Sequence, residues 1–423
     1  MRNKNKKFIA TALGGLLFST GFILFGCNNS PTPPPAEEYN PTKIVLMIGD
    51  GMGITHVDCA QTYLEEGDLL NMKSFRYSGE VDPDSLTTLE NSSKASDSAA
   101  GATALATGTR VYNDYLSMDK EGNVLKTIAE LADDKGLGVG IVTTDILFEA
   151  TPAAFYSHTS NRYNYIDIRS AQYNCDFDLF LGADAYMENL LQDDQGYYYK
   201  DSEVKEGVEY TNGYIYELEQ QKILDAGYTY VTDYFELDMN SNKIFGAFPS
   251  IAKSKFKAPS SKGRLDGKLK NTTPCLSQLT EFAINFMEEK FPQGYFLMIE
   301  DNDIDVECEN WNDKTKDKMT ERYITGDMVE CLLEFDRSIG TVKRTLDKAN
   351  EDYAIIVSAD HATGSLVEEQ GVEDIYSFWS SGHDPWANVP YFIEAKNLDL
   401  EESILNTDIF VYMDALIKNI KAN

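Results

Sequence analysis

The residues able to carry chemistry in this 423-residue chain follow short apolar runs. Four of these runs are each followed, within a few positions, by an acidic residue or a histidine. The pairs are Asp50 after KIVLMIG, Thr144 and Asp145 after VGIVT, Glu300 and Asp305 after YFLMI, and Asp360-His361 after AIIVSA. Carboxylate oxygens together with imidazole nitrogen are suitable ligands for zinc and magnesium. A strand-end acid often only caps a helix, but four such coincidences favour a metal-dependent site.

A second candidate segment is Ser96–Gly108, with the sequence SDSAAGATALATG. Its small residues predict a close-packing helix over 99–106, and Gly108 is a suitable residue to end it. Ser98 would then lie at the helix N-terminus, where free N–H groups and the helix dipole favour an anion. The alternative is that the polar run only caps the helix, which would account for one of its three residues.

Histidine is scarce, which limits every assignment of an imidazole. The chain has His56, His158, His361 and His383 and no others. We expect His56 in the helix after Asp50, as a surface or packing residue rather than a ligand.

The elements that must position these residues alternate between strands and helices. Buried strands are predicted at Lys43–Ile48, Val139–Thr143, Tyr295–Ile299, Ala354–Val357 and Val389–Ile393. Helices are predicted at Leu125–Asp133, Leu276–Lys290 and Asp327–Lys348. Continuous apolar strands interleaved with helices predict an α/β fold whose mostly parallel sheet is covered on both faces. In such sheets sites form beyond the carboxyl ends of the strands, so the candidate residues should meet there.

Composition excludes one class of partner. The chain has 37 Lys and Arg against 69 Asp and Glu, a net charge of −32. Such a surface repels phosphate backbones, so we expect no nucleic-acid binding. Five cysteines beyond Cys27 show no CxxC spacing, so neither a disulfide framework nor a zinc knuckle is indicated, although one or two bridges stay open.

The N-terminus predicts a signal peptide over residues 1–26, since basic residues precede an apolar run from Phe8 to Phe25. Leu24–Cys27 is similar to a lipobox, in which Cys27 is lipidated, and residues 27–41 form a Pro-rich linker. An uncleaved membrane anchor is the alternative. We therefore expect an exported, membrane-anchored lipoprotein, with its folded domain at residues 42–423 on the periplasmic or cell-surface side.

Several motifs occur in the order seen in alkaline phosphatases, and the chain resembles that family from about Lys43 to a C-terminal helix at Asn406–Ile420. They are Ile48–Gly53, Asp97-Ser98-Ala-Ala, Ala150–Ala154 with His158 and Arg162, Glu300 with Asp305, Asp360-His361, and Ser381-Gly-His383. The resemblance implies a three-layer α/β sandwich with a central, mostly parallel, doubly wound sheet and peripheral insertions. It also implies two zinc ions, one magnesium, and hydrolysis of small phosphate monoesters through a phosphoserine. A homodimer is compatible with it.

The resemblance also implies a role for each matched residue. Ser98 would be the nucleophile, Arg162 would bind two phosphate oxygens through its planar guanidinium, and Asp97 would orient Arg162. His158 would orient the segment that carries Arg162. The zinc that activates Ser98 would be held by Asp50, Asp360 and His361. The magnesium would be held by Asp50, Thr151 and Glu300, with Glu149 at a neighbouring position where the family commonly has Asp or His.

The other zinc site departs from the family pattern, which has an Asp, a His four residues later, and a distant His. Asp305 and His383 fit, but Glu309 stands at the middle position, and Glu307 is a second carboxylate nearby. A third carboxylate would make the site more negative and would favour another divalent ion over zinc.

Two other functions stay open at this point. A phosphodiesterase of the same superfamily is disfavoured, because the Asp97 and Arg162 pair suits the exposed oxygens of a monoester. A non-catalytic metal- or phosphate-binding lipoprotein is conceivable because of the missing histidine.

Overall fold

The computed structural model describes residues 41–183, 220–253, 273–309, 318–349, 352–364, 366–367, 378–379, 387–396, 398 and 400–420. All of them belong to the unit Tyr39–Asn423. The predicted signal peptide, Cys27, nearly all of the linker, and His383 lie outside the described residues. Within the described ranges, no helix has the length and apolar character needed to cross a membrane.

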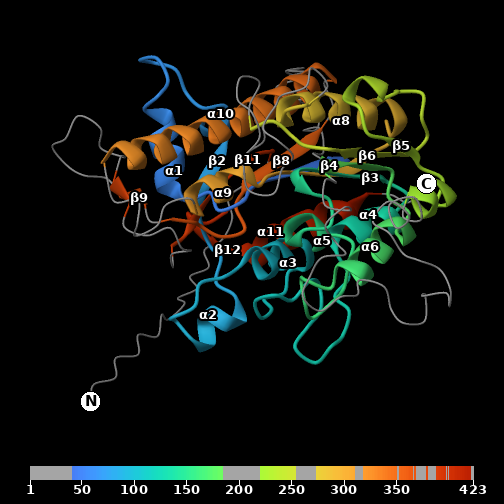
Figure 1. Ribbon diagram of the computed structural model, residues 1–423, viewed down its shortest axis with the longest axis horizontal. Coiled ribbons are helices and arrows are strands. Elements are labelled where there is room, and N and C mark those ends of the chain that lie inside the picture. The colour runs from blue at the N-terminus through green and yellow to red at the C-terminus, as the bar shows by residue number, and fades with distance from the viewer. Residues whose placement is uncertain are drawn as a thin grey trace, which may run out of the picture. The chain divides into compact units, whose positions relative to one another are not determined.

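A sheet of ten described strands forms the centre of this unit (Figure 1). In spatial order the strands are β12 (Ser403–Leu405), β2 (Tyr77–Asp82), β11 (Val389–Glu394), β8 (Tyr353–Ser358), β1 (Lys43–Gly49), β7 (Tyr295–Asp301), β3 (Gly138–Ile146), β4 (Leu179–Ala183), β6 (Ile244–Phe248) and β5 (Thr229–Val231). Within this sheet β11 runs antiparallel to β8 and β2, and the other pairs are parallel. The mostly parallel sheet is therefore confirmed.

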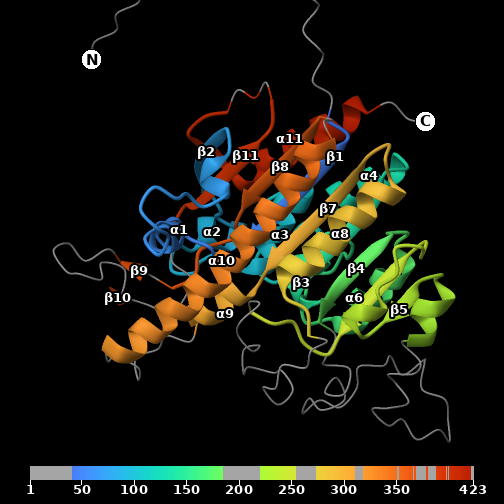
Figure 2. The same ribbon diagram turned by 90° about the horizontal axis from the view of Figure 1, so that it is seen from above.

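Helices cover both faces of the sheet, which confirms the three-layer arrangement (Figures 1 and 2). One layer contains α1 (Ile54–Gln61), α8 (Leu276–Lys290), α9 (Asp303–Glu309) and α10 (Lys318–Ala349). The other contains α3 (Ser98–Thr107), α4 (Ile128–Asp134), α5 (Ala150–Ala153), α6 (Tyr165–Asn174) and α11 (Asn406–Asn419). Helix α10 packs against α8, α9 and α1, and α11 packs against α3 and α4.

Smaller described elements complete the unit. They are α2 (Leu86–Glu90), the 3-10 turns at Met72–Ser74 and Tyr234–Glu236, and an antiparallel pair of β9 (Leu366–Val367) with β10 (Phe378–Trp379). The five cysteines beyond Cys27 all lie in the described ranges and are free thiols.

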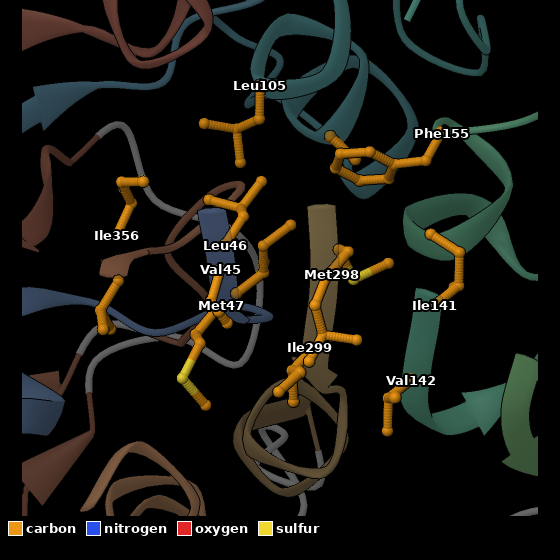
Figure 3. Packing of buried hydrophobic residues seen from close by; sticks show 14 of the residues in the cluster. Val45, Leu46, Met47, Leu105, Ile141, Val142, Phe155, Met298, Ile299 and Ile356 are labelled. Carbon is orange, nitrogen blue, oxygen red and sulfur yellow. The ribbon is translucent and has the colours of Figure 1, made fainter. Parts of the chain in front are cut away.

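The central strands are apolar over most of their length because both of their faces are covered. All seven residues of β1 are buried, as are all seven of β7. Leu105 of α3 and Phe155 lie over one face of β1, β7 and β3 (Figure 3). Phe155 also stacks on Phe296, with 6.1 Å between ring centroids.

The sheet extends further than the sequence patterns predicted. The weak periodicity between about 185 and 270 predicts peripheral elements and loops. The described part of this stretch supplies β5 and β6, which lie at one edge of the sheet, and β6 is buried at all five positions. β4, with the sequence LFLGA, was not predicted either. These runs are only three to five residues long and two contain glycine, so periodicity alone does not separate them from loops.

Helix α3 approaches the end of β8 closely because it has glycine at position 101. A Cβ at Gly101 would lie 2.3 Å from the carbonyl oxygen of Asp360, which is closer than real Cβ contacts. The close approach brings the first turn of α3 to the loop that carries Asp360 and His361.

We expect Gly101→Ala to lower the free energy of unfolding by about 1–3 kcal/mol, because backbone atoms must shift to make room for the methyl group. Gly326→Ala in α10 is the matched control, since a Cβ there would meet nothing within 4 Å. Glycine loses more conformational entropy than alanine when a helix forms, so Gly326→Ala should be as stable as the wild type, or more stable by up to about 1 kcal/mol. Urea unfolding measures both, and equal losses in the two variants would contradict this packing argument.

Candidate active site

Four adjacent strands deliver the predicted residues to one edge of the sheet. β8, β1, β7 and β3 are neighbours, and Ile48 of β1 pairs with Glu300 of β7 and Ser358 of β8. The strands therefore end at the same level. The side chains that follow them are almost fully buried, with 1% of Asp50, 1% of Glu300, 0% of Asp360 and 4% of His361 exposed. The predicted convergence is confirmed.

The centre of the site is a group of two carboxylates around one imidazole. Nε2 of His361 lies 3.4 Å from Oδ1 of Asp50 and 3.5 Å from Oδ2 of Asp360. Asp305 joins the group, since ligand atoms of Asp50, Asp305 and His361 all lie within 4.8 Å of one another. Such spacing is what a single divalent cation requires of its protein ligands.

The orientation of the His361 ring follows from its other nitrogen. Nδ1 lies 3.3 Å from the carbonyl oxygen of Ala362 and 3.1 Å from Oγ1 of Thr363. A carbonyl can only accept, so Nδ1 carries the proton. Nε2 then presents its lone pair to Asp50 and Asp360, as a ligand nitrogen must.

Electrostatics in this group are unfavourable without a cation. Burial, reinforced by Asp360, raises the pKa of Asp50 to about 8. Burial also raises the pKa of Glu300, to which Asp50 contributes, and the pKa of Asp360. Oδ1 of Asp50, Oε1 of Glu300 and Oδ2 of Asp360 are buried and accept no hydrogen bond from any residue that the structure describes. Unpaired buried oxygens are costly, so these residues fit a divalent cation well.

A second set of oxygens lies beside Asp50, toward β3. Oγ1 of Thr151 donates to Oδ2 of Asp50 at 3.2 Å, and Oγ1 of Thr143 donates to Glu300 at 2.5 Å. Nδ2 of Asn302 also donates to Asp50, at 3.4 Å. The sequence patterns predicted no role for Thr143 or Asn302. Thr143 reaches Glu300 only through the register of β3 on β7.

Ser98 is the first residue of α3, as predicted, and Asp97 is its N-cap. Oδ1 of Asp97 accepts the N–H of Ala100 at 2.9 Å, and Gly108 ends the helix with φ of +67°. Oγ of Ser98 lies 3.1 Å from Nε2 of His361. A cation held by His361 would therefore lie next to the Ser98 hydroxyl, at the positive end of a helix.

Arg162 lies between two carboxylates at the rim of the site. Its NH1 group is 3.6 Å from Asp97, and its NH2 group is 3.6 Å from Glu149. Burial opposes its charge, but Asp97 and Glu149 raise the pKa of Arg162 above its ordinary value. Nε is buried and makes no hydrogen bond. The guanidinium therefore stays charged and is oriented from both sides.

His158 contacts none of the predicted metal ligands that lie in the described ranges. Its Nδ1 lies 2.9 Å from the carbonyl oxygen of Ser117, and its Nε2 lies 3.1 Å from Glu130 at the start of α4. The next residue, Thr159, pairs with Leu116. These contacts hold the segment that leads to Arg162.

The predicted ligands of the other zinc are only partly brought together. Asp305 lies in the first turn of α9 and joins the central group, while Glu309 ends α9 and is exposed. The two are four residues apart on the same side of the helix. Glu307 is buried in an ion pair with Lys253, so its charge is already compensated. His383 lies outside the described residues.

Comparison with known sequences identifies the alkaline phosphatase family. The alkaline phosphatase profile matches residues 42–389. Alkaline phosphatase 4 of Bacillus subtilis strain 168 is 29% identical over 335 residues, which are 77% of this chain and 62% of that protein. Alkaline phosphatase 3 of the same organism is 28% identical over 413 residues, 94% of this chain and 78% of that protein. The chain thus spans less than two thirds of the first of these relatives.

Solved structures share the fold. The alkaline phosphatase of the Antarctic bacterium TAB5 has a TM-score of 0.66 at 21% identity, over 90% of this chain and 100% of that chain. The Thermus thermophilus alkaline phosphatase has a TM-score of 0.65 at 16% identity, over 90% of this chain and 91% of that chain. Because the family profile covers most of the chain, including all four strands that end at this site, the chain belongs to the alkaline phosphatase family.

Proposed function

We propose that this chain hydrolyses phosphate monoesters through a phosphoserine at Ser98. The observation that carries the proposal is the position of the Ser98 hydroxyl, 3.1 Å from Nε2 of His361 at the N-terminus of α3. Asp50 and Asp360, which carry buried unpaired oxygens, lie 3.4 and 3.5 Å from the same Nε2. The guanidinium of Arg162 lies 3.6 Å from Asp97, the residue before Ser98. Membership of the alkaline phosphatase family supports the same reaction.

We propose zinc-type ions at Asp50, Asp360 and His361, and at Asp305 with Glu309 and His383, and magnesium at Asp50, Thr151 and Glu300. Ions bound there would neutralise the acids and lower the pKa of the Ser98 hydroxyl. The oxygen-rich set around Glu300 suits magnesium. A variant of the TAB5 enzyme was solved with Mg bound in its M3 site. With Glu309 in place of histidine, the Asp305 site would prefer a harder ion than its counterparts do.

In the proposed reaction Ser98 attacks phosphorus and Arg162 binds the phosphate. Oγ of Ser98 gives up its proton to solvent water and forms a bond to phosphorus while the bond from phosphorus to the ester oxygen breaks. The ester oxygen takes a proton from water and leaves as the alcohol. Arg162 binds the other phosphate oxygens through its fork of N–H donors. Water then breaks the bond between phosphorus and Ser98, which releases inorganic phosphate and restores the hydroxyl.

We further propose that the chain is exported and tethered through a lipid on Cys27. The basic and apolar segments before Cys27 and the proline-rich residues after it support this proposal. Cys27→Ser should move the protein from the membrane to the soluble fraction without loss of turnover. An unchanged membrane fraction would favour the uncleaved anchor instead.

Ser98→Ala should lower the turnover of an aryl phosphate monoester by at least about a thousandfold, because it removes the nucleophile. Acid quenching of the wild type should trap phosphate on the peptide that contains Ser98. Ser96→Ala is the control, since the buried Ser96 hydroxyl makes no hydrogen bond and its loss should leave turnover intact. Retained turnover in Ser98→Ala would contradict the mechanism, and faster cleavage of a diester would favour a phosphodiesterase.

Chelation should abolish turnover, and zinc with magnesium should restore it. Without ions the folded state keeps a proton on Asp50 up to about pH 8, whereas the unfolded chain releases it near pH 4. The stability that this proton contributes is lost as the pH rises through about 8. We therefore expect the Tm of the ion-free protein to fall by a few degrees between pH 5 and 9.

Calorimetry with and without added ions measures this effect. The ion-free Asp50→Asn variant, which lacks the titrating group, should show a flatter dependence. Recovery of Tm but no turnover with any set of ions would favour a non-catalytic metal-binding protein.

A further inference from the structure

His56 is a buried histidine that takes no part in the proposed chemistry. It lies in α1, 1% exposed, beneath the loop that follows Asp50. Burial lowers its pKa to about 4, so the ring is neutral in the folded protein. The sequence predicted a surface or packing residue, and burial shows that it packs.

The ring is held in one tautomer. Nδ1 accepts the N–H of Gly53 at 2.9 Å, so Nδ1 carries no proton and Nε2 must carry it. Hydrogen bonds to the backbone of Gly51 and Gly364 oppose the lowering of the pKa, as carbonyl acceptors do. Nε2 also lies 3.8 Å from Sγ of Cys308.

These contacts reach three separate segments. Gly51 and Gly53 belong to the loop after β1, Gly364 to the loop after β8, and Cys308 to α9. Each segment carries predicted ligands: Asp50, then Asp360 with His361, then Asp305.

The same segments also meet directly at Gly51. Its N–H donates to Asp360 at 3.2 Å, and its carbonyl oxygen accepts the N–H of Thr363 at 2.9 Å. A Cβ at Gly51 would lie 2.6 Å from Oδ1 of Asp305, and φ there is +68°. Small displacements of Gly51 would therefore change the spacing of all three sets of ligands.

We infer that His56 is a positioning residue that holds these three segments at the spacing required for divalent-ion binding. The inference rests on the proposed metal site but not on turnover. Groups that orient first-shell ligands in this way typically account for a 10–100-fold effect on metal affinity.

The test is zinc affinity of the full chain, measured by competition with a chromophoric chelator after removal of bound ions. His56→Leu removes every polar contact of the ring, and we expect it to bind zinc at least about tenfold more weakly than the wild type. His56→Gln places an N–H₂ group near the position of Nε2 and should retain most of the affinity. His56→Asn can still accept from Gly53 but reaches neither Gly51 nor Gly364, so it should resemble His56→Leu.

Asp336→Ala is the matched control for loss of buried hydrogen bonds. The Asp336 carboxylate accepts the backbone N–H groups of Asn71 and Met72 and the side-chain amide of Asn71, none of which belongs to the site. We expect Asp336→Ala to lower the Tm but to keep wild-type zinc affinity. Excess zinc should restore kcat in His56→Leu, because every ligand is intact.

Equal zinc affinity in the wild type, His56→Gln and His56→Asn would overturn the inference, even if His56→Leu failed to fold. A loss of affinity in His56→Leu that only matches the loss in Asp336→Ala would also overturn it. Failure of the wild type to bind zinc would instead refute the proposed metal site, and the inference with it.

Discussion

Repulsion among buried carboxylates is the constraint on which the rest of this structure depends. Asp50, Glu300 and Asp360 lie together almost without solvent, and each has an oxygen that accepts no hydrogen bond. A fold meets such a cost only where cations or protons compensate the charge. The net charge of −32 describes the whole chain and does not by itself require buried acids at this edge. The concentration of acids here therefore reflects the site rather than the surface.

The scaffold holds these acids together by several independent means. The parallel register of β8, β1 and β7 ends the strands at one level, and the N–H of Asp50 donates to the carbonyl oxygen of Asp301 at 3.0 Å. Gly101 lets α3 approach Asp360, which brings Ser98 to His361. Arg162 reaches the site from a different loop and is held there by Asp97 and Glu149. The proposed nucleophile, the proposed cation ligands and the guanidinium thus come from elements far apart in the sequence.

Much of the fold could be predicted because its central elements are strongly patterned. The five predicted strands all exist, and α8 begins and ends at the predicted residues. Helix α10 begins at Lys318 rather than Asp327 and α4 begins three residues later than predicted, since boundaries depend on capping and packing. β4, β5 and β6 were missed because their short runs become strands only by pairing with a sheet that already exists.

The sequence by itself determined which residue types could do chemistry and that they follow buried strands, because a continuous apolar run that ends in polar residues is a local property. It also determined that Ser98 begins a helix, through Asp97 as its cap and small residues after it. Only the tertiary structure decided that Thr143 and Asn302 donate to the acids and that Glu307 is paired with Lys253. It also decided that His56 contacts three segments that carry the proposed ligands. Those relations depend on strand register and on contacts between distant segments, which no local pattern encodes.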